Sequence, residues 1–210
     1  MIYIMIDAII YINLEHRMDR NEHIIHEIKK IDPTLSKTHR LNAEYVTTNG
    51  ALGCALSHVK AIEMCFEHPE WTRCLILEDD FTFTSSDPEE CNRQVMELIT
   101  LSPSFDVLLL AFGHDDFVYQ PTDSPLINRV LSSQTTSGYL VHKNYMGVLL
   151  NNFRISSDIL RNRGRCHDGC LDQYWKRLMP QGKWYSYHIR IGYQYANYSD
   201  IEGIFHDYQC

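Results

Sequence analysis

Continuous apolar runs of strand length alternate with helical patterns along this chain of 210 residues, and this order most constrains its fold. The runs do not alternate polar with apolar residues, so they indicate strands that are covered on both faces. Strands that alternate with helices predict an α/β fold with a mainly parallel central sheet flanked by helices. The runs are AIIYINL (8–14), CLILE (74–78), FDVLLLAF (105–112) and GYLVH (138–142), and the helical patterns cover 18–30, 55–68, 87–99 and 143–153.

The length suits one domain spanning residues 1–210, which is enough chain to bury a sizeable core. The last third, from Ser156 onward, is less periodic and richer in Arg, Gly, Tyr and His. We expect this part to add loops and short elements over the sheet rather than a second domain.

Charge and hydropathy exclude several classes of protein. Lys and Arg number 19 against 27 Asp and Glu, and the net charge of -8 argues against a general nucleic-acid binder. The apolar opening run, MIYIMIDAIIYINL, is broken by Asp7 and Asn13 and is too short to span a bilayer. It also lacks the positive start and cleavage site of a signal peptide, so it indicates a buried strand or strand pair and no integral membrane segment. Seven cysteines at irregular spacing favour a reduced compartment and leave one disulfide open.

Three consecutive carboxylates, Glu78, Asp79 and Asp80, follow the apolar run CLIL, and no basic residue lies nearby in sequence. In open α/β sheets, ligands bind outside the carboxyl ends of the strands. Clustered carboxylates are tolerated there when a divalent cation bridges them, and hard cations prefer oxygen ligands. Such a cation would also neutralise phosphate charge on a substrate. The residues alone equally allow a solvated loop start without a ligand.

Six segments then occur in one order along nearly the whole chain. Together they resemble glycosyltransferase family 25, which includes bacterial lipooligosaccharide galactosyltransferases and the procollagen galactosyltransferases. The resemblance implies a GT-A-like nucleotide-sugar-binding fold, a UDP-sugar donor, Mn²⁺ and inversion of the anomeric carbon. The segments are YINLEHRMDR (11–20), GALGCALSHVKAIE (50–63), LILEDDF (75–81), SGYLVHKNYMGVLL (137–150), LDQYW (171–175) and QYANYSDIEG (194–203).

The same resemblance implies roles for the acidic residues. Glu78 and Asp80 become the metal-binding pair, with Asp80 as the direct Mn²⁺ ligand and Asp79 between them beside the nucleotide. Departure of UDP builds charge on the β-phosphate, which a divalent ion stabilises. Apart from the resemblance, His206 is a possible extra metal or phosphate ligand, and His188 is a weaker candidate.

Donor-binding residues are implied in several of the matched segments. Arg17 and Arg20 suit a diphosphate because the planar guanidinium can bind it bidentately, although both could be ordinary surface charges. Two glycines ahead of a helix form a weak anion-binding pattern, and His58 could equally be a core histidine. The donor-binding set is Asn13, Arg17, Arg20, Gly53, Ser57, His58, Asp79, Ser137, Gly138, Gln194, Ser199 and Asp200.

An inverting transfer needs a base that takes the proton of the acceptor hydroxyl. The family carries an acid in the LDQYW segment, so the resemblance makes Asp172 the catalytic base. The alternative is a helix N-terminal acid that stabilises the helix dipole. Cys166, His167 and Cys170 could be part of a zinc site, but no second Cys/His pair has matching spacing. The basic loop RNRGR (161–165) reads as a solvated loop, with an ordered diphosphate contact as the alternative.

The sequence thus predicts a metal-dependent inverting glycosyltransferase that moves a hexose, with galactose as the first choice, from a UDP-sugar to a hydroxyl acceptor. That acceptor is a glycan or a collagen-like hydroxylysine. UDP-glucose and UDP-N-acetylglucosamine stay open as donors, and so does a non-catalytic sugar-nucleotide-binding protein. Unlike the procollagen enzymes, the chain shows no signal peptide and no ER-retention tail, which favours the cytoplasm of a bacterium or of a virus-infected host. The oligomeric state stays open.

Overall fold

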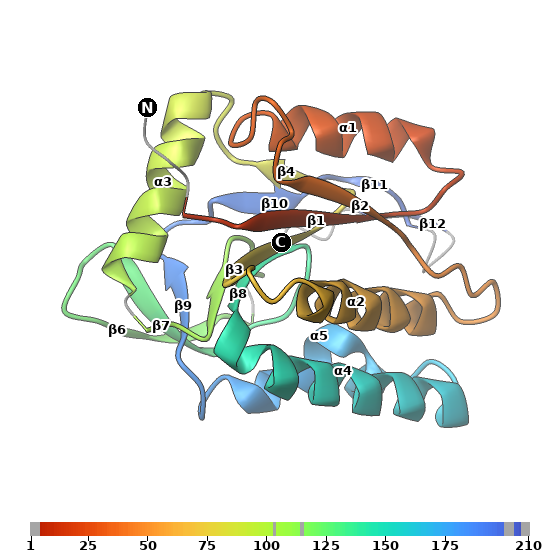
Figure 1. Ribbon diagram of the computed structural model, residues 1–210. Coiled ribbons are helices and arrows are strands. Elements are labelled where there is room, and N and C mark those ends of the chain that lie inside the picture. The colour runs from red at the N-terminus through yellow and green to blue at the C-terminus, as the bar shows by residue number, and fades with distance from the viewer. Residues whose placement is uncertain (1–4, 103, 114–115, 200–203, 207–210) are drawn as a thin grey trace.

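The computed structural model describes residues 5–102, 104–113, 116–199 and 204–206 (Figure 1). In these residues an eight-stranded sheet has the order β2-β1-β3-β8-β5-β9-β7-β6. The four predicted strands all belong to it. Its strands are β1 (Ala8–Asn13), β2 (Thr38–Asn42), β3 (Arg73–Glu78), β5 (Val107–Leu109), β6 (Val118–Pro121), β7 (Ile127–Ser132), β8 (Gly138–His142) and β9 (Trp184–Tyr187).

The sheet is mainly parallel in direction, as predicted, but two strands are reversed. β8 pairs antiparallel with both β3 and β5, and β7 pairs antiparallel with both β9 and β6. Because β1 pairs parallel with β2 and β3, and β5 with β9, the other six of the eight strands run one way. The carboxyl ends of β1, β2 and β3 therefore lie along one edge.

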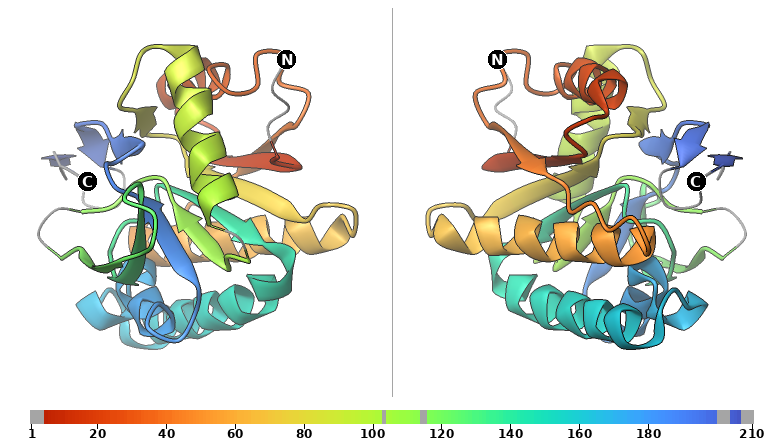
Figure 2. Two further views of the ribbon diagram at one scale, coloured as in Figure 1. Left: turned by 90° about the vertical axis from the view of Figure 1, so that its left-hand side faces the viewer. Right: turned by 90° about the vertical axis from the view of Figure 1, so that its right-hand side faces the viewer.

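Helices cover both faces of this sheet (Figures 1 and 2). The four predicted helices are all present, as α1 (Met18–Ile28), α2 (Gly50–Glu67), α3 (Pro88–Leu101) and α4 (Lys143–Arg163). A shorter helix, α5 (Leu171–Tyr174), is flanked by the 3₁₀ turns η1 (His167–Gly169) and η2 (Trp175–Leu178). Among the described residues, none of the helices has both the length and the apolar character required to cross a membrane.

Strand β1 shows why the apolar runs are continuous. Ala8, Ile10 and Ile12 face the core that α2 and α4 cover, whereas Ile9 and Tyr11 face the core that α1 and α3 cover. All five side chains are buried. Each fully buried large aliphatic side chain contributes about 1.5–3 kcal/mol relative to an exposed one, so both faces of the strand have to be apolar.

The path of the chain around β1 creates the crevice in which the site lies. From β1 the chain crosses through α1 to β2 on one side of β1, and then through α2 to β3 on its other side. Right-handed crossovers in opposite directions put α1 and α2 on opposite faces of the sheet. A crevice opens at such a switch point, outside the carboxyl ends of the strands.

Two buried tryptophans pack the last third of the chain against the sheet. The rings of Trp175 in η2 and Trp184 in β9 meet edge to face at 5.1 Å, and the indole N–H of Trp175 donates to the Ser133 carbonyl at 3.0 Å. Aromatic pairs in this geometry add about 0.5–1.5 kcal/mol to their burial. This anchoring holds the neighbouring α5, which carries Asp172, against the sheet.

Helix α2 begins at Gly50 rather than at residue 55, so the two glycines do not precede the helix as predicted. The side chain of Asn49 caps the helix by accepting from the Leu52 amide at 3.2 Å. Gly53 lies in the first turn, where a Cβ would stand 2.5 Å from the carbonyl oxygen of Glu44. The glycine is therefore needed for close packing of two backbone segments.

The structure of the second half of the chain also differs from the elements that its sequence pattern predicts. The run 105–112 forms ladder pairs only over Val107–Leu109, and α4 continues past residue 153 to Arg163. The last third supplies a strand of the main sheet, β9, besides short elements. Two small sheets complete the described structure: β4 (Phe81–Phe83) with β10 (Gly192–Gln194), and β11 (Asn197–Ser199) with β12 (Ile204–His206).

Candidate active site

A pocket of about 390 Å³ lies outside the carboxyl ends of β1, β2 and β3. This volume is in the range of small-molecule sites. Its wall combines apolar residues that end β1 and follow β2 with the acidic triplet, one face of α2, and the segment around α5. The lining includes Ile12, Leu14, Arg20, Ala43, Glu44, Cys54, Ser57, His58, Glu78, Asp79, Asp80, Thr135, Thr136, Arg165, Cys170, Asp172 and Gln194.

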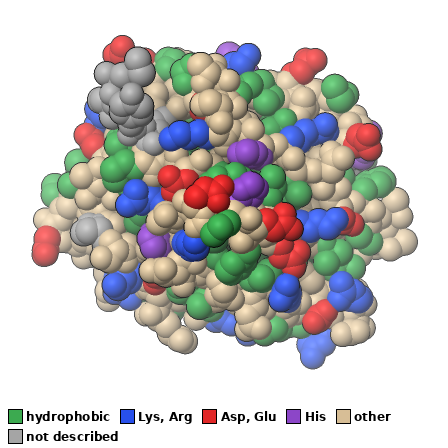
Figure 3. Space-filling model, in the orientation of Figure 1, with side chains coloured by type: hydrophobic (Ala, Val, Ile, Leu, Met, Phe, Trp, Pro, Cys, Tyr) green, Lys and Arg blue, Asp and Glu red, His purple; other side chains and the backbone are tan. Residues whose placement is uncertain are grey.

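Charges of both signs occur near one another on the molecular surface. On the face that Figure 3 shows, acidic and histidine side chains gather near the middle, with lysine and arginine side chains between and around them. A general nucleic-acid binder would show a continuous basic face. This mixed surface agrees with the acidic net charge.

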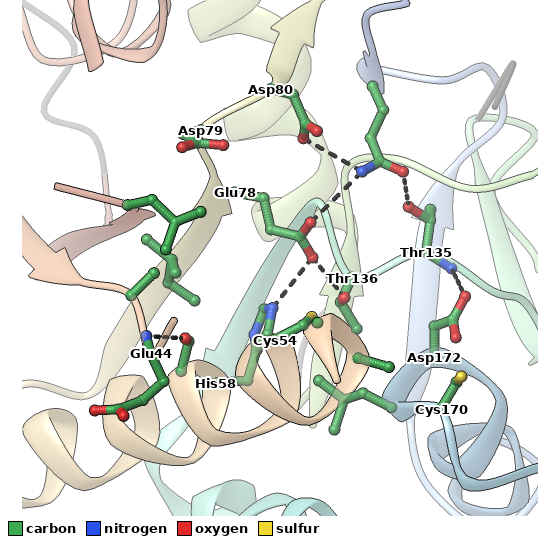
Figure 4. Close-up of a pocket in the computed structure, with 18 of the residues that line it drawn as sticks. Glu44, Cys54, His58, Glu78, Asp79, Asp80, Thr135, Thr136, Cys170 and Asp172 are labelled. Carbon is green, nitrogen blue, oxygen red and sulfur yellow. Dashed lines mark hydrogen bonds and ion pairs between the residues drawn. The ribbon is translucent and has the colours of Figure 1, made fainter. Parts of the chain in front are cut away.

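Glu78, the last residue of β3, is held by two donors (Figure 4). Nε2 of His58 lies 3.1 Å from Oε1 of Glu78, and the hydroxyl of Thr136 donates to the same oxygen at 2.6 Å. A carboxylate only accepts, so Nε2 of His58 carries the proton and Nδ1 accepts from the Tyr139 hydroxyl at 3.0 Å. Burial opposes ionisation, but the hydrogen bonds from His58 and Thr136 lower the pKa of Glu78.

The next two carboxylates meet a basic residue from another element. Nη1 of Arg20 in α1 lies 2.9 Å from Oδ1 of Asp79 and 3.3 Å from Oδ2 of Asp80. Asp79 also accepts from the side-chain amide of Asn13 at 2.7 Å. Burial raises the pKa of Asp79, and Arg20 opposes that effect. The neutralising charge that is absent nearby in sequence thus comes from a residue far along the chain.

Glu78 and Asp80 share one hydrogen-bond donor. The side-chain nitrogen of Gln194 lies 3.5 Å from Oε2 of Glu78 and 3.3 Å from Oδ1 of Asp80 (Figure 4). Burial and the neighbouring carboxylates raise the pKa of Asp80 to about 7, against the opposing charge of Arg20. A positive charge added nearby would favour the ionised form of this carboxyl group.

This donor set fits a hard divalent cation. Oε2 of Glu78 and Oδ1 of Asp80 both lie within 3.5 Å of the side-chain nitrogen of Gln194, and carboxylate oxygens are the ligands that Mn²⁺ and Mg²⁺ prefer. A second, mixed donor set lies beside it. The potential ligand atoms of Cys54, His58 and Glu78 all lie within 4.8 Å of one another.

Asp172 faces the pocket from the start of α5 (Figure 4). Its Oδ2 accepts from the amide of Thr135 at 3.4 Å, and burial raises the pKa of its carboxyl group, with Glu78 adding to the effect. The hydroxyl of Thr135 donates to Oε1 of Gln194 at 3.0 Å. Thr135 and Gln194 therefore link Asp172 to the acidic triplet.

Thr135 itself has an unusual backbone. Its φ of 72° lies in the left-handed region, which β-branched residues rarely adopt. Such conformations cost about 1–3 kcal/mol and cluster at functional sites. In this conformation the amide of Thr135 donates to Oδ2 of Asp172.

The structure brings together many of the sequence-predicted site residues. Ser57 is among those that line the pocket, but its hydroxyl donates to the Gly53 carbonyl at 2.7 Å and accepts from the Glu44 amide at 2.8 Å. This hydroxyl thereby ties α2 to the segment after β2. The predicted residues that line the pocket are Arg20, Ser57, His58, Glu78, Asp79, Asp80, Asp172 and Gln194.

Five other predicted residues do not line the pocket. They are Asn13, Arg17, Gly53, Ser137 and Gly138. Asn13 is fully buried and orients Asp79. Arg17 pairs with the exposed Asp19 at 2.8 Å.

Ser137 and Gly138 have packing environments. Ser137 is fully buried, with its hydroxyl 3.4 Å from that of Thr135. A Cβ on Gly138 would stand 2.6 Å from the Phe81 ring. Like Gly53, this glycine allows a close approach inside the core.

Four predicted residues remain at the end of the chain or away from the pocket. The backbone of Ser199 pairs with Ile204, and that of His206 lies in β12, while Asp200 lies outside the described residues. His188 is exposed and its ring contacts Tyr187 at 4.6 Å.

Several lining residues were not predicted. Cys54 lies one helical turn before His58, and this spacing was a usable signal. Thr135 precedes the predicted Ser137, but no sequence pattern indicates its backbone conformation. Arg165, from the basic loop, does line the pocket.

The described cysteines do not pair with one another. The six described cysteines are free thiols. Among the described residues, the potential metal ligands that lie close together are those of Cys54, His58 and Glu78. Cys166, His167 and Cys170 do not form such a group.

Comparisons with known proteins concern the family and the fold of this chain. Residues 26–158 match the sequence model of glycosyltransferase family 25 (LPS biosynthesis protein), which is more than half of the chain. No curated protein matches the chain.

Among solved structures, the chain is similar to a glycosyltransferase involved in the glycosylation of the major capsid of PBCV-1. The TM-score is 0.56 and the sequence identity is 12%, and the match covers 85% of this chain and 80% of that one. This likeness shows the expected GT-A-like fold. Mannose-1-phosphate geranyltransferase from Thermus thermophilus has a TM-score of 0.46 and 10% identity over 95% of this chain and 74% of that one.

Proposed function

This chain belongs to glycosyltransferase family 25, and from that premise we propose that it transfers a hexose from a UDP-sugar to an acceptor hydroxyl with the help of a divalent cation. Galactose is the proposed sugar and Mn²⁺ the proposed ion. The observation that carries the proposal is the pair Glu78 and Asp80, which share the amide of Gln194 in a pocket that Asp172 also faces.

The proposed site separates binding of the donor from activation of the acceptor. Glu78 and Asp80 would hold the cation, whose charge offsets the charge that develops on the departing diphosphate. The guanidinium groups of Arg20 and Arg165 also line the pocket and suit a diphosphate. The apolar residues Ile12 and Leu14 offer a surface for the uracil ring.

Asp172 is the proposed base. Its carboxylate takes the proton of the acceptor hydroxyl while the acceptor oxygen forms a bond to C1 of the sugar. The bond between C1 and the diphosphate oxygen breaks, and its electron pair leaves with UDP. Attack from the side opposite the diphosphate inverts C1. The raised pKa of Asp172 makes the carboxylate a better proton acceptor than an exposed aspartate.

The acceptor is proposed as a glycan hydroxyl or a hydroxylysine side chain. The family description refers to LPS biosynthesis, and the similar PBCV-1 protein takes part in glycosylation of a capsid. Both descriptions support a glycan-related acceptor. UDP-glucose and UDP-N-acetylglucosamine are the alternative donors.

The test measures sugar transfer and UDP release with UDP-galactose, UDP-glucose and UDP-N-acetylglucosamine, with Mn²⁺ or with a chelator. Terminal galactosides, N-acetylglucosaminides and a hydroxylysine peptide serve as acceptors. We expect acceptor-dependent UDP release that requires the metal and is fastest with UDP-galactose. UDP binding without any transfer across the panel would favour a non-catalytic binding protein instead.

A further inference from the structure

A mixed set of sulfur, nitrogen and oxygen donors lies in the wall of the pocket beside the carboxylate pair. Cys54 and His58 are four residues apart on α2, so their side chains share one face of the helix. Glu78 reaches the same place from the end of β3 (Figure 4). The three potential ligand atoms lie within 4.8 Å of one another, and all three residues line the pocket.

The ring of His58 is held with Nε2 directed toward Glu78. His58 is 1% exposed, and the hydroxyl of the buried Tyr139 occupies its Nδ1 at 3.0 Å. Metal-binding histidines typically have their other ring nitrogen fixed by such a partner. The hydroxyl of Thr136 similarly holds Glu78 at 2.6 Å.

We propose that Cys54, His58 and Glu78 form a site for a thiophilic divalent cation such as Zn²⁺, distinct from the carboxylate pair but sharing Glu78 with it. Thiolate, imidazole and carboxylate are the three ligand types that zinc uses, and three protein ligands leave a fourth position for water or substrate. A hard cation such as Mn²⁺ has little preference for the sulfur. The two sites therefore select different metals.

Binding at this site changes the protonation of two ligands. The thiol of Cys54 gives its proton to solvent as the bond between sulfur and metal forms, because the thiolate is the ligand. The imidazole of His58 stays neutral but changes tautomer: its proton leaves Nε2, which binds the metal, and Nδ1 becomes the protonated nitrogen that donates to the Tyr139 hydroxyl. No oxidation or reduction takes place. Because this thiol proton is released, binding strengthens as the pH rises.

The consequence for activity rests on the proposed function. If Glu78 serves the donor cation, zinc at Cys54 and His58 engages the same carboxylate and inhibits transfer. The inhibition would then be specific to thiophilic ions, and added Mn²⁺ would oppose it.

The test uses Co²⁺ as a spectroscopic substitute for zinc and calorimetry with Zn²⁺ itself, on the full chain. The variants are Cys54→Ala and, as a matched control, Cys170→Ala, because Cys170 also lines the pocket and lies outside the cluster. We expect one Co²⁺ with a thiolate-to-metal charge-transfer band in the wild type and in Cys170→Ala. In Cys54→Ala the band should vanish and zinc affinity should fall at least about tenfold. Thermal melting without metal checks that each variant is folded.

Each other outcome overturns the proposal. No thiolate band in the wild type, a band that persists in Cys54→Ala, or its loss in Cys170→Ala would each mean that these three residues do not form the site. These binding readouts need no turnover, so failure of the proposed function would leave them unchanged. Where transfer is measurable, zinc inhibition is compared with the activity of the same variant without zinc, and inhibition should be weaker in Cys54→Ala.

Discussion

Nη1 of Arg20 lies 2.9 Å from Oδ1 of Asp79, and both side chains are nearly buried although 59 residues separate them in the chain. This contact joins α1 to the end of β3. It also supplies positive charge to a group of three carboxylates that would otherwise repel one another. The ion pair is therefore central to keeping the apo site folded.

Replacing Arg20 by Ala should destabilise the protein by about 3–5 kcal/mol, because the change leaves buried carboxylates without their partner. Added Mn²⁺ should restore part of this loss, since it supplies positive charge at the same group. The measurement is denaturant unfolding with and without Mn²⁺.

Arg17→Ala is the matched control for this change. Arg17 lies one turn earlier and pairs with Asp19, whose side chain is 65% exposed, so its loss leaves no buried carboxylate without a partner and should cost less than the loss of Arg20. Equal destabilisation by the two variants would contradict the assigned role of Arg20.

Gly138→Ala tests whether this glycine serves packing. A Cβ there would stand 2.6 Å from the buried Phe81 ring, so the variant should lose about 1–3 kcal/mol of stability. In Gly147→Ala, the control, the new methyl meets nothing within 4 Å on helix α4, and stability should rise by about 0.5–1 kcal/mol. Thermal melting of both variants measures the difference, and an unchanged melting temperature for Gly138→Ala would show that the core accommodates the methyl.

Asp172→Asn keeps the shape of the side chain but removes its basicity. Transfer should fall about 10²–10⁴-fold while the affinity for UDP changes little, because the residue acts on the acceptor. Asp168→Asn is the control, since Asp168 is exposed and does not line the pocket. If Asp172→Asn instead lost UDP and metal binding, Asp172 would be a ligand, and full activity would move the base elsewhere.

The pH dependence of transfer should report the same group. A base works only when deprotonated, so activity falls as the pH drops through the pKa of Asp172. Burial raises that pKa above its ordinary value of 3.8, so the acidic limb of kcat/KM should lie above the range of an exposed aspartate. A limb that remains unchanged in Asp172→Asn variants with residual activity would assign it to another group.

UDP should raise the melting temperature in the presence of Mn²⁺. A ligand at one hundred times its dissociation constant stabilises the native state by about 2.7 kcal/mol, which is about 5–10 °C for a chain of this length. ADP and GDP should give smaller shifts if the pocket selects uridine. Equal shifts with the three nucleotides would argue against a uridine-specific site.

The pattern of apolar and polar residues along the chain was enough to predict the fold class and much of the sheet. The runs that became β1, β3 and β8 are long, continuous and apolar, and their burial on both faces follows from that composition. The reversed direction of β8 was not predictable, because it depends on how β8 pairs with β3 and β5 across the sheet.

The candidate site was predictable in its acidic part and not in its partners. Glu78 to Asp80 follow a buried strand, which is visible in the sequence, whereas the contacts of Arg20 and Gln194 with Asp80 depend on the complete fold. The start of α2 was missed for a related reason. Gly53 reads as a turn residue, but it is needed where the helix packs against the Glu44 carbonyl.

The central claim is that Glu78 and Asp80 together hold a divalent cation that is needed for departure of UDP. Its most direct test is the rate of UDP release as Mn²⁺ is titrated into wild-type protein and into Asp80→Asn, with Asp19→Asn as an exposed aspartate control. We predict saturable activation by Mn²⁺ in the wild type and in Asp19→Asn, and loss of that activation in Asp80→Asn with the fold retained. The same Mn²⁺ dependence in Asp80→Asn as in the wild type would contradict the account.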